Sequence, residues 1–445
     1  MRDPATTELA RHRALELASL GLAEAAEDAC RHWTMLAPED PGAWLLLGTL
    51  ALQRGAADEA EGTLRRALSL NPQHPAALSH LAVALQRQAK PKEAELFARR
   101  AVDIEPANAA YWSNLGACLF DQQRWADAAE MFRQAVALSP ASGACWSNLG
   151  AAELRGGQLR TARQALERSL ELAPGQPKVL TDYASVLARL GEPARALEIL
   201  QSVLASYPQA AQAWLAAGFA LQALGQFTKA LQVLRQAHAL APQQFEVRHN
   251  LALVLAQLNK LAEAEDLARQ NVNEHPQAAE AWWLLGVVLE RQGRIDEVLA
   301  AEQRALQLAP DAEYHRSLLM TSQYADGVSP QSLLAAHRQW SALYAEPLQP
   351  TELVLPPRPG SHRPLRIGFI SADFYAHPIG FLALAAIECL DKTNCQVFCY
   401  SDVRREDAIT ACFRAAATSW RATLGLTSDD WPSRFGATTS MCLWT

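Results

Sequence analysis

Four polar side chains recur at one position of a repeated sequence pattern: Asn114, Asn148, Asp182 and Asn250. A carboxamide offers a hydrogen-bond donor and an acceptor, which together can bracket a peptide backbone without reading its side chains. Each such pairing contributes only about 0.5–1.5 kcal/mol net, so the row predicts weak presentation of a protein segment. The alternative interpretation is that these four are ordinary exposed residues of helices.

The pattern that carries these residues returns every 34 residues, without a slip, from Pro41 to Ala312. Each copy has a small residue in each half and a closing proline, which in the clearest copy are Gly116, Ala128 and Pro140. A period of this size predicts an array of helical hairpins. Small residues let two helices approach closely, and proline cannot continue the second helix. We therefore expect a stack of hairpins with a concave groove lined by the first helix of each.

The array is expected to contain eight hairpins over residues 41–312, and residues 1–40 predict a degenerate first repeat or cap. Terminal repeats are atypical because one of their faces meets solvent. The bulky residues of the clearest copy should fill the space between hairpins: Trp112, Leu115, Leu119 and Phe132.

The composition excludes several classes of protein. A net charge of −7 and a pI near 5.9 argue against a nucleic-acid-binding protein, because neutralising phosphates needs clustered Lys and Arg. No apolar run is long enough to span a membrane, and no signal-peptide core follows Met1. The eight cysteines form no CxxC pair, which favours free thiols and a cytoplasmic location. Cys395 and Cys399 lie four residues apart on a predicted strand, but no further ligands complete a metal site.

The period fails after Pro310, and the texture of the sequence changes twice. Residues 313–347 predict a helical connector in which Ser329 caps a helix over residues 331–344. Residues 348–364 contain five prolines and predict a linker. Strands are then predicted over residues 365–371 and 396–400, with helices over 381–390 and 407–417. This order predicts the start of a parallel α/β lobe over residues 365–431, whose ligands would bind near the loop 373–380.

The repeats resemble the tetratricopeptide repeat (TPR) family. Together with the runs Ala336–Trp340, Arg366–Phe374, His377-Pro378 and Val397–Ser401, they resemble the protein O-GlcNAc transferase family in a bacterial form, including its Spindly-type relatives. The resemblance implies a mostly α fold: a right-handed TPR superhelix, a short connector and an incomplete α/β lobe of the GT-B type. In that family the repeat position described first faces the groove, so Asn114, Asn148, Asp182 and Asn250 would bind an acceptor peptide.

The same resemblance implies transfer of a sugar from a UDP- or GDP-sugar donor to Ser or Thr hydroxyls of proteins. It implies no cofactor and no required metal, since the nucleotide sugar, UDP-GlcNAc in the family, is a substrate. His377 matches a family histidine proposed as a general base, and a neutral imidazole can take a hydroxyl proton near pH 7. The alternative is that His377 only shapes the loop before Pro378. Asp373 is expected to hold that loop by accepting backbone hydrogen bonds.

The sequence departs from the family after about Trp431, because no second lobe with a nucleotide site follows. Residues 432–445 do not predict the family's next strand. Codons permitted in another reading frame give an apolar strand pattern there, so we expect that a frameshift near Phe435 created this end. Three hypotheses follow: a truncated transferase that is inactive alone, a transferase completed by another polypeptide, or a protein-binding TPR scaffold with a vestigial α/β tail.

Overall fold

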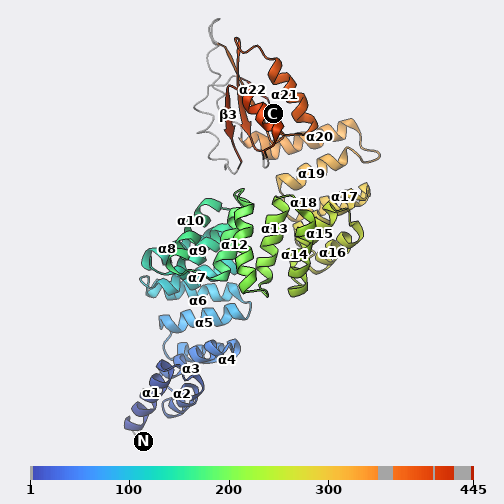
Figure 1. Ribbon diagram of the computed structural model, residues 1–445. Coiled ribbons are helices and arrows are strands. Elements are labelled where there is room, and N and C mark those ends of the chain that lie inside the picture. The colour runs from blue at the N-terminus through green and yellow to red at the C-terminus, as the bar shows by residue number, and fades with distance from the viewer. Residues whose placement is uncertain (1–3, 349–363, 404–405, 425–441, 445) are drawn as a thin grey trace. The chain divides into compact units, whose positions relative to one another are not determined.

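The structure is a computed structural model that describes residues 4–348, 364–403, 406–424 and 442–444 (Figure 1). The chain divides into two compact units. The first comprises residues 1–189 and 195–216, and the second comprises residues 190–194 and 217–445. Helices dominate both units, and the second also contains a small parallel sheet.

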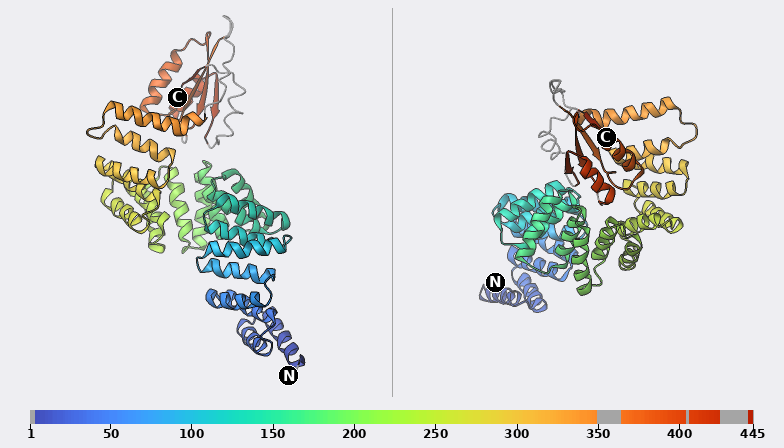
Figure 2. Two further views of the ribbon diagram at one scale, coloured as in Figure 1. Left: turned by 180° about the vertical axis from the view of Figure 1, so that it is seen from behind. Right: turned by 45° about the horizontal axis from the view of Figure 1, so that its top comes forward.

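Residues 4–206 form twelve helices: α1 (Pro4–Ser19), α2 (Ala23–Leu36), α3 (Pro41–Arg54), α4 (Ala57–Leu70), α5 (Pro75–Arg87), α6 (Pro91–Ile104), α7 (Ala109–Asp121), α8 (Trp125–Leu138), α9 (Gly143–Arg155), α10 (Leu159–Leu172), α11 (Pro177–Arg189) and α12 (Pro193–Ser206). From α1 to α10 they pair in order as antiparallel hairpins, and each hairpin contacts the next. Figure 2 shows these pairs following one another from blue to green. The predicted helical repeats are therefore confirmed, and the segment expected to be degenerate is also a hairpin.

Residues 211–348 continue as helices: α13 (Ala211–Ala223), α14 (Phe227–Leu240), α15 (Phe245–Gln257), α16 (Leu261–Glu274), α17 (Ala279–Arg291), α18 (Ile295–Leu308), α19 (Ala312–Ser322) and α20 (Pro330–Trp340), with a π-helical turn at Ser341–Ala345 and a 3-10 turn at Glu346–Leu348. Ser329 caps α20 as expected, since its side chain accepts a hydrogen bond from the Ser332 amide. The helix is shorter than predicted, because its last turns widen into the π-helical segment.

One backbone feature marks the hairpin turns with the same 34-residue period. A residue in the left-handed conformation, with φ between 57° and 88°, stands at Gly21, Gly55, Ala89, Gln123, Gly157, Gly191, Gly225, Asn259, Gly293 and Gly327. A left-handed residue after the first helix lets the chain turn back and satisfies the last carbonyls of that helix. The expectation that the period fails after Pro310 is therefore wrong for the backbone. Gly327 makes α19 and α20 one further hairpin, although its small-residue pattern is lost.

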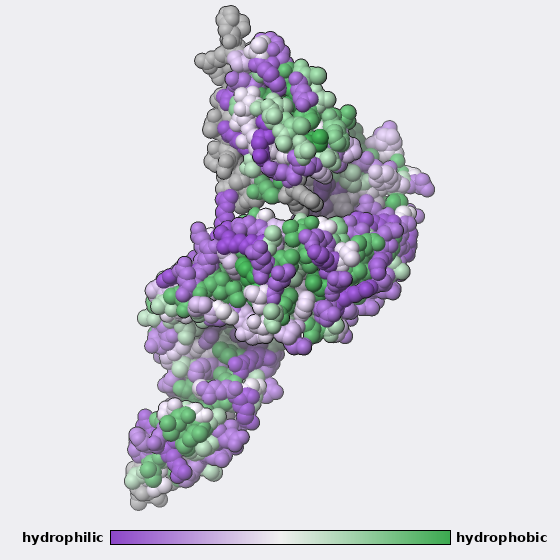
Figure 3. Space-filling view, viewed as in Figure 1, coloured by the Kyte–Doolittle hydropathy of each residue, from purple (hydrophilic) through white to green (hydrophobic). Residues whose placement is uncertain are grey.

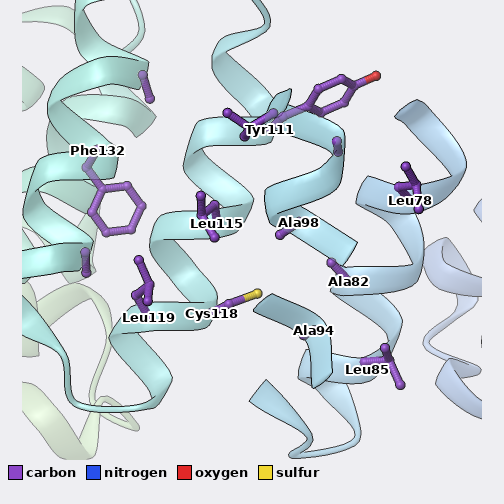
Figure 4. Packing of buried hydrophobic residues seen from close by; sticks show 14 of the residues in the cluster. Leu78, Ala82, Leu85, Ala94, Ala98, Tyr111, Leu115, Cys118, Leu119 and Phe132 are labelled. Carbon is purple, nitrogen blue, oxygen red and sulfur yellow. The ribbon is translucent and has the colours of Figure 1, made fainter. Parts of the chain in front are cut away.

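Within a hairpin, a small residue on the first helix faces a large one on the second. A Cβ atom added to Gly116 would lie 2.7 Å from the Phe132 ring, and one added to Gly150 would lie 2.5 Å from Leu166. In Figure 4 the Phe132 ring lies beside Leu115 and Leu119 in this packed interior. Ala82 replaces the glycine in the preceding repeat, and the equivalent second-helix residue there is the smaller Ala98.

The tryptophan of the repeats has a second role besides the predicted packing. Trp112 is partly exposed, and it packs against the buried residues of the array, which agrees with the predicted packing role. Its indole nitrogen donates a hydrogen bond of 2.8 Å to the carbonyl of Pro106, six residues earlier. The same bond is made by four other tryptophans to the preceding proline: Trp44, Trp146, Trp214 and Trp282. The indole therefore ties the first helix of a repeat to the turn that precedes it.

The second unit ends in a four-stranded parallel sheet with the order β3-β2-β1-β4. Its elements are β1 (Leu365–Ser371), α21 (Pro378–Cys389), β2 (Cys395–Ser401), α22 (Ala408–Ala416), β3 (Ser419–Ala422) and β4 (Cys442–Trp444). β1 and β2 pair in parallel, with Leu365 opposite Cys395, as the predicted order of elements requires. Phe374, Ile387, Val397, Cys399 and Phe413 form the core beneath the helices.

The α/β part differs from the expectation at three places. α21 begins at Pro378 rather than at residue 381, because the preceding residue, His377, caps it. β3 was not predicted. β4 lies in the segment 432–445, where no strand was expected, and pairs with β1 through Ile367 and Cys442. The expected linker, except for its two end residues 348 and 364, and residues 425–441 lie outside the described residues.

Helix α21 is apolar on more than one side. Leu384 and Ile387 are buried against the sheet, while Ile379, Phe381 and Leu382 are 52%, 54% and 75% exposed. Figure 3 shows apolar residues gathered over this helix. Among the described helices of both units, none is long and apolar enough to cross a membrane.

Candidate functional site

A row of polar side chains lies on consecutive first helices of the first unit: Asn114 on α7, Asn148 on α9 and Asp182 on α11. Helix α9 contacts both α7 and α11, so equivalent positions on the three helices are neighbours. All three residues are partly exposed. We call these three residues the polar row. The structure thus brings three of the four predicted peptide-binding residues together.

The two asparagines of the polar row differ in how many of their side-chain donors and acceptors are already used in hydrogen bonds within the protein. The Asn114 amide nitrogen donates to the Ser79 hydroxyl at 2.8 Å, and its carbonyl oxygen has no partner among the described residues. Within the described residues the Asn148 side chain has no hydrogen-bond partner. Its amide is therefore ready to donate to and accept from a bound backbone, the pairing that a carboxamide permits.

Asp182 is the most constrained member of the polar row. Its Oδ2 atom is buried and has no hydrogen-bond partner among the described residues. Burial raises the pKa of its carboxyl, and the positive charges of Lys178 and Arg155 act in the opposite direction. A buried acceptor without a donor costs free energy.

His80 on α5 occupies the same repeat position next to the polar row, but its hydrogen bonding is internal. Its Nδ1 atom lies 2.9 Å from the oxygen of Thr49, whose hydroxyl donates to the Leu45 carbonyl at 2.9 Å. Burial lowers the pKa of His80, so the ring is held neutral. Sequence reasoning missed Thr49 and Ser79, the partners of His80 and Asn114. The 34-residue register could have found Ser79, because Ser113, Ser147 and Thr181 recur at its position.

Asn250 belongs to the second unit, and its side-chain amide forms hydrogen bonds within that unit. Its nitrogen donates to the Glu246 carbonyl at 2.8 Å, one turn earlier on α15, and its oxygen lies 3.5 Å from the Gln222 amide nitrogen. Asn250 therefore has less hydrogen-bonding capacity left than Asn148.

The loop between β1 and α21 is the second predicted site, and its backbone packs tightly around Gly380. A Cβ atom on Gly380 would lie 2.2 Å from the Tyr375 carbonyl oxygen and 2.6 Å from that of Asp373, so only glycine fits. Asp407, the N-cap of α22, accepts a hydrogen bond from the Ala376 amide at 2.8 Å. The amides of Thr410 and Ala376 hold the pKa of Asp407 below its usual value. Asp407 therefore ties the loop to α22.

Asp373 does not hold the loop in the way that the sequence predicts. Among the described residues its carboxylate accepts no backbone hydrogen bond; instead its amide donates to the Ser371 hydroxyl at 3.0 Å. Sequence reasoning missed Asp407 because it lies 31 residues from Ala376 along the chain. Only the packing of α22 beside the loop brings the two together.

His377 caps helix α21. Its Nδ1 atom accepts a hydrogen bond from the Ile379 amide at 3.3 Å and lies 3.9 Å from an Asp373 carboxylate oxygen. In a neutral imidazole one nitrogen carries the proton, so an accepting Nδ1 places that proton on Nε2. In this arrangement the ring has no free acceptor with which to take a proton. The geometry therefore matches the loop-shaping alternative better than the general base.

Cysteine and metal chemistry have little support in the described residues. Burial raises the pKa of Cys30, Cys118 and Cys399 to about 12, so these thiols stay protonated at neutral pH. Within the described ranges, no group of three or more His, Cys, Asp or Glu side chains is placed to hold a metal ion.

Comparison with known families matches the repeats. The family described as the TPR domain of cytochrome c-type biogenesis protein H matches residues 29–144 and 132–244, and the tetratricopeptide repeat family matches residues 249–313. A solved mutant of O-GlcNAc transferase from Thermobaculum terrenum is 29% identical, over 52% of this chain and 45% of that one, with a TM-score of 0.48.

Two plant proteins also match, each described as a probable UDP-N-acetylglucosamine–peptide N-acetylglucosaminyltransferase SPINDLY. The protein from Hordeum vulgare is 34% identical over 113 residues, and that from Oryza sativa subsp. japonica is 30% identical over 115 residues. These segments are 24% and 26% of this chain but only 11% and 12% of the plant proteins. Residues 29–244 and 249–313 are therefore tetratricopeptide repeats, with distant similarity to the repeat regions of SPINDLY and O-GlcNAc transferases.

Proposed function

We propose that this chain is a TPR protein-interaction scaffold, and that its polar row presents an extended protein segment by its backbone. The observation that carries the proposal is the partly exposed amide of Asn148, which has no hydrogen-bond partner among the described residues, in one row with the carbonyl oxygen of Asn114. Donors and acceptors of this kind bind a peptide backbone whatever its side chains are. Because each contact contributes only about 0.5–1.5 kcal/mol, binding is weak and reversible.

The similarity to SPINDLY supports a common evolutionary origin of the two repeat regions. We propose that the repeats derive from the acceptor-presenting arm of a protein O-glycosyltransferase, in which the bound segment carries the Ser or Thr to be modified. Sugar transfer by this chain alone is not part of the proposal. In the β1–α21 loop, the amides of Asp373, Ala376 and Ile379 already donate to side chains of this chain, so they are not offered to a phosphate.

The scaffold proposal is tested with a fluorescein-labelled, uncharged peptide of Ser, Thr and Gly titrated with the full chain. The double variant Asn114→Ala, Asn148→Ala should weaken binding about tenfold, which corresponds to about 1.4 kcal/mol. The matched control is Asn273→Ala, which removes an exposed carboxamide from the second helix α16. Equal affinity of the double variant and the unaltered chain would refute the role of the polar row.

A calorimetric titration with UDP and with UDP-GlcNAc tests separately whether this chain binds a sugar donor. We expect no heat of binding for either nucleotide. A measurable affinity would favour a transferase over a scaffold, and His377→Ala would then show whether that histidine contributes to the site.

A further inference from the structure

A row of aromatic rings lies on consecutive first helices of the second unit. It consists of His249 on α15, Trp283 on α17 and Tyr314 on α19, all partly exposed. The ring centroids of His249 and Trp283 are 6.4 Å apart with nearly parallel planes, and those of Trp283 and Tyr314 are 6.5 Å apart. The repeat position of His249 and Trp283 is that of Ser147 and Thr181 in the first unit. On α19 the equivalent residue is Ser317, and Tyr314 lies about one helical turn before it.

Carboxylates flank these rings. Glu246 and Glu280 are exposed, and both act electrostatically on His249. Glu280 and Asp311 also act on Tyr314. Neither Glu246 nor Glu280 forms an ion pair with a cation among the described residues of the unit. Burial lowers the pKa of His249, so at neutral pH the ring itself adds no positive charge. The surface therefore combines π faces with uncompensated negative charge.

We propose that His249, Trp283 and Tyr314, with Glu246 and Glu280, form a docking surface for an extended peptide with Lys or Arg at alternate positions. The proposal deepens the protein-binding function proposed above and rests on it. Cations are attracted both to the faces of aromatic rings and to unpaired carboxylates. An extended chain advances about 3.3 Å per residue, so its alternate side chains lie about 6.6 Å apart on one side. This spacing matches the ring separations of 6.4 and 6.5 Å.

The test uses the full chain and fluorescence anisotropy with labelled peptides at physiological salt. One peptide alternates four Lys with four Thr, a second has the same composition in two blocks, and a third alternates Ser with Thr. We expect the alternating Lys peptide to bind about tenfold more tightly than either of the others. Equal binding of the alternating and blocked peptides would show attraction by net charge alone, and equal binding of the uncharged peptide would show a surface that does not select cations. Either result overturns the proposal.

Variants locate the surface. Glu246→Gln combined with Glu280→Gln should weaken binding of the alternating Lys peptide about tenfold. The control Asp266→Asn removes an exposed charge from the second helix α16 that forms no ion pair with a described residue, and it should change the affinity less than about twofold. Trp283→Leu should weaken binding about tenfold, while Trp283→Phe should keep it within about threefold, because the ring is retained. Circular dichroism checks folding of each variant, and an equal effect of Asp266→Asn and the double Gln variant would overturn the proposal.

The two protein-binding proposals fail separately. The uncharged peptide of Ser, Thr and Gly reports on the polar row through Asn114 and Asn148, whereas the alternating Lys peptide reports on the aromatic surface. Loss of uncharged-peptide binding in the Asn variants, together with no selectivity among the charged peptides, would leave the scaffold standing and refute only the aromatic surface.

Discussion

Gly116 on α7 lies against the ring of Phe132 on α8, so closely that a Cβ atom at position 116 would be 2.7 Å from the Cε1 atom of that ring. Real Cβ atoms do not approach a carbon so closely, so the ring would have to move. Phe132 is itself buried, with 3% of its surface exposed. The pair shows that a ring of this size on the second helix leaves no room for a Cβ atom at the facing position.

Gly116→Ala should therefore destabilise the first unit by about 1–3 kcal/mol through overpacking. The control is Gly62→Ala on α4, where an added Cβ atom meets no heavy atom within 4 Å. That substitution should stabilise by about 0.5–1 kcal/mol, because alanine has the higher helix propensity. Urea unfolding of both variants measures the difference, and a stabilising Gly116→Ala would contradict the packing.

The left-handed turn residues give a second prediction. Ala89 and Gln123 adopt φ values of 57° and 60°, which favour glycine, while Gly55 has a φ of 85° at the equivalent position. A side chain in this conformation costs about 1–2 kcal/mol. Ala89→Gly should stabilise the first unit by about 0.5–1 kcal/mol after the entropy cost of glycine, and Gly55→Ala should destabilise it by a similar amount. Thermal unfolding that gave the opposite signs would contradict the assigned turn geometry.

The repeats could be predicted from the sequence because each position has one dominant physical demand. A closing proline and a small residue at each helix crossing repeat every 34 residues, and they place the helices of the array. The bonds between Trp112 and Pro106 could not be predicted, because an indole has an apolar body and a polar N–H and suits either a core or a turn. The hairpin α19–α20 was missed because only the turn residue Gly327 keeps the period there.

The two predicted sites differed in how much the sequence could predict. Asn114, Asn148 and Asp182 come together because the repeat register converts sequence spacing into neighbouring positions on α7, α9 and α11. The β1–α21 loop has no such register. Its shape depends on Asp407, whose contact with Ala376 exists only after α22 packs, and on a hydrogen bond that sets the tautomer of His377.

Loss of a tryptophan–proline hydrogen bond should lower the free energy of unfolding by less than removal of a buried ring does. Trp112→Phe keeps most of the apolar contact and loses only the hydrogen bond to the Pro106 carbonyl. We expect a loss of about 0.5–1.5 kcal/mol, below the roughly 3–5 kcal/mol of a large cavity in a core. Urea unfolding measures this change. A loss in the cavity range would indicate that the smaller Phe ring leaves a large space unfilled.

The α/β part should exchange its amide hydrogens faster than the repeats. Its core is small, and α21 leaves Ile379, Phe381 and Leu382 more than half exposed. Regions with few buried apolar contacts open at a low cost in free energy. Hydrogen exchange with mass spectrometry should show less protection over residues 365–401 than over residues 41–189. Equal protection of the two segments would contradict this prediction.

Glu302 predicts a pH dependence in the second unit. Glu302 stands at the repeat position that Phe132 occupies five repeats earlier, and it is 4% exposed. It accepts a hydrogen bond from the Ser317 hydroxyl on α19. Burial raises the pKa of its carboxyl, and the nearby charge of Glu290 raises it further, against the lowering effect of Ser317 and Thr321. The folded state thus prefers the protonated form more than the unfolded state does. The stabilisation that comes from this preference is fully present below the pKa of Glu302 in the unfolded state, about 4.3. It is lost as the pH rises through the pKa of Glu302 in the folded state.

Glu302→Gln keeps the shape of the side chain and removes the charge, so it should stabilise the second unit at pH 7. The gain should shrink as the pH falls toward 4, where the native carboxyl is already neutral. Urea unfolding of the full chain at pH 7 and pH 4 measures the difference, with Asp266→Asn as a control at an exposed position on α16. A gain that is equal at both pH values, or larger at pH 4, would contradict a raised pKa of Glu302 in the folded protein.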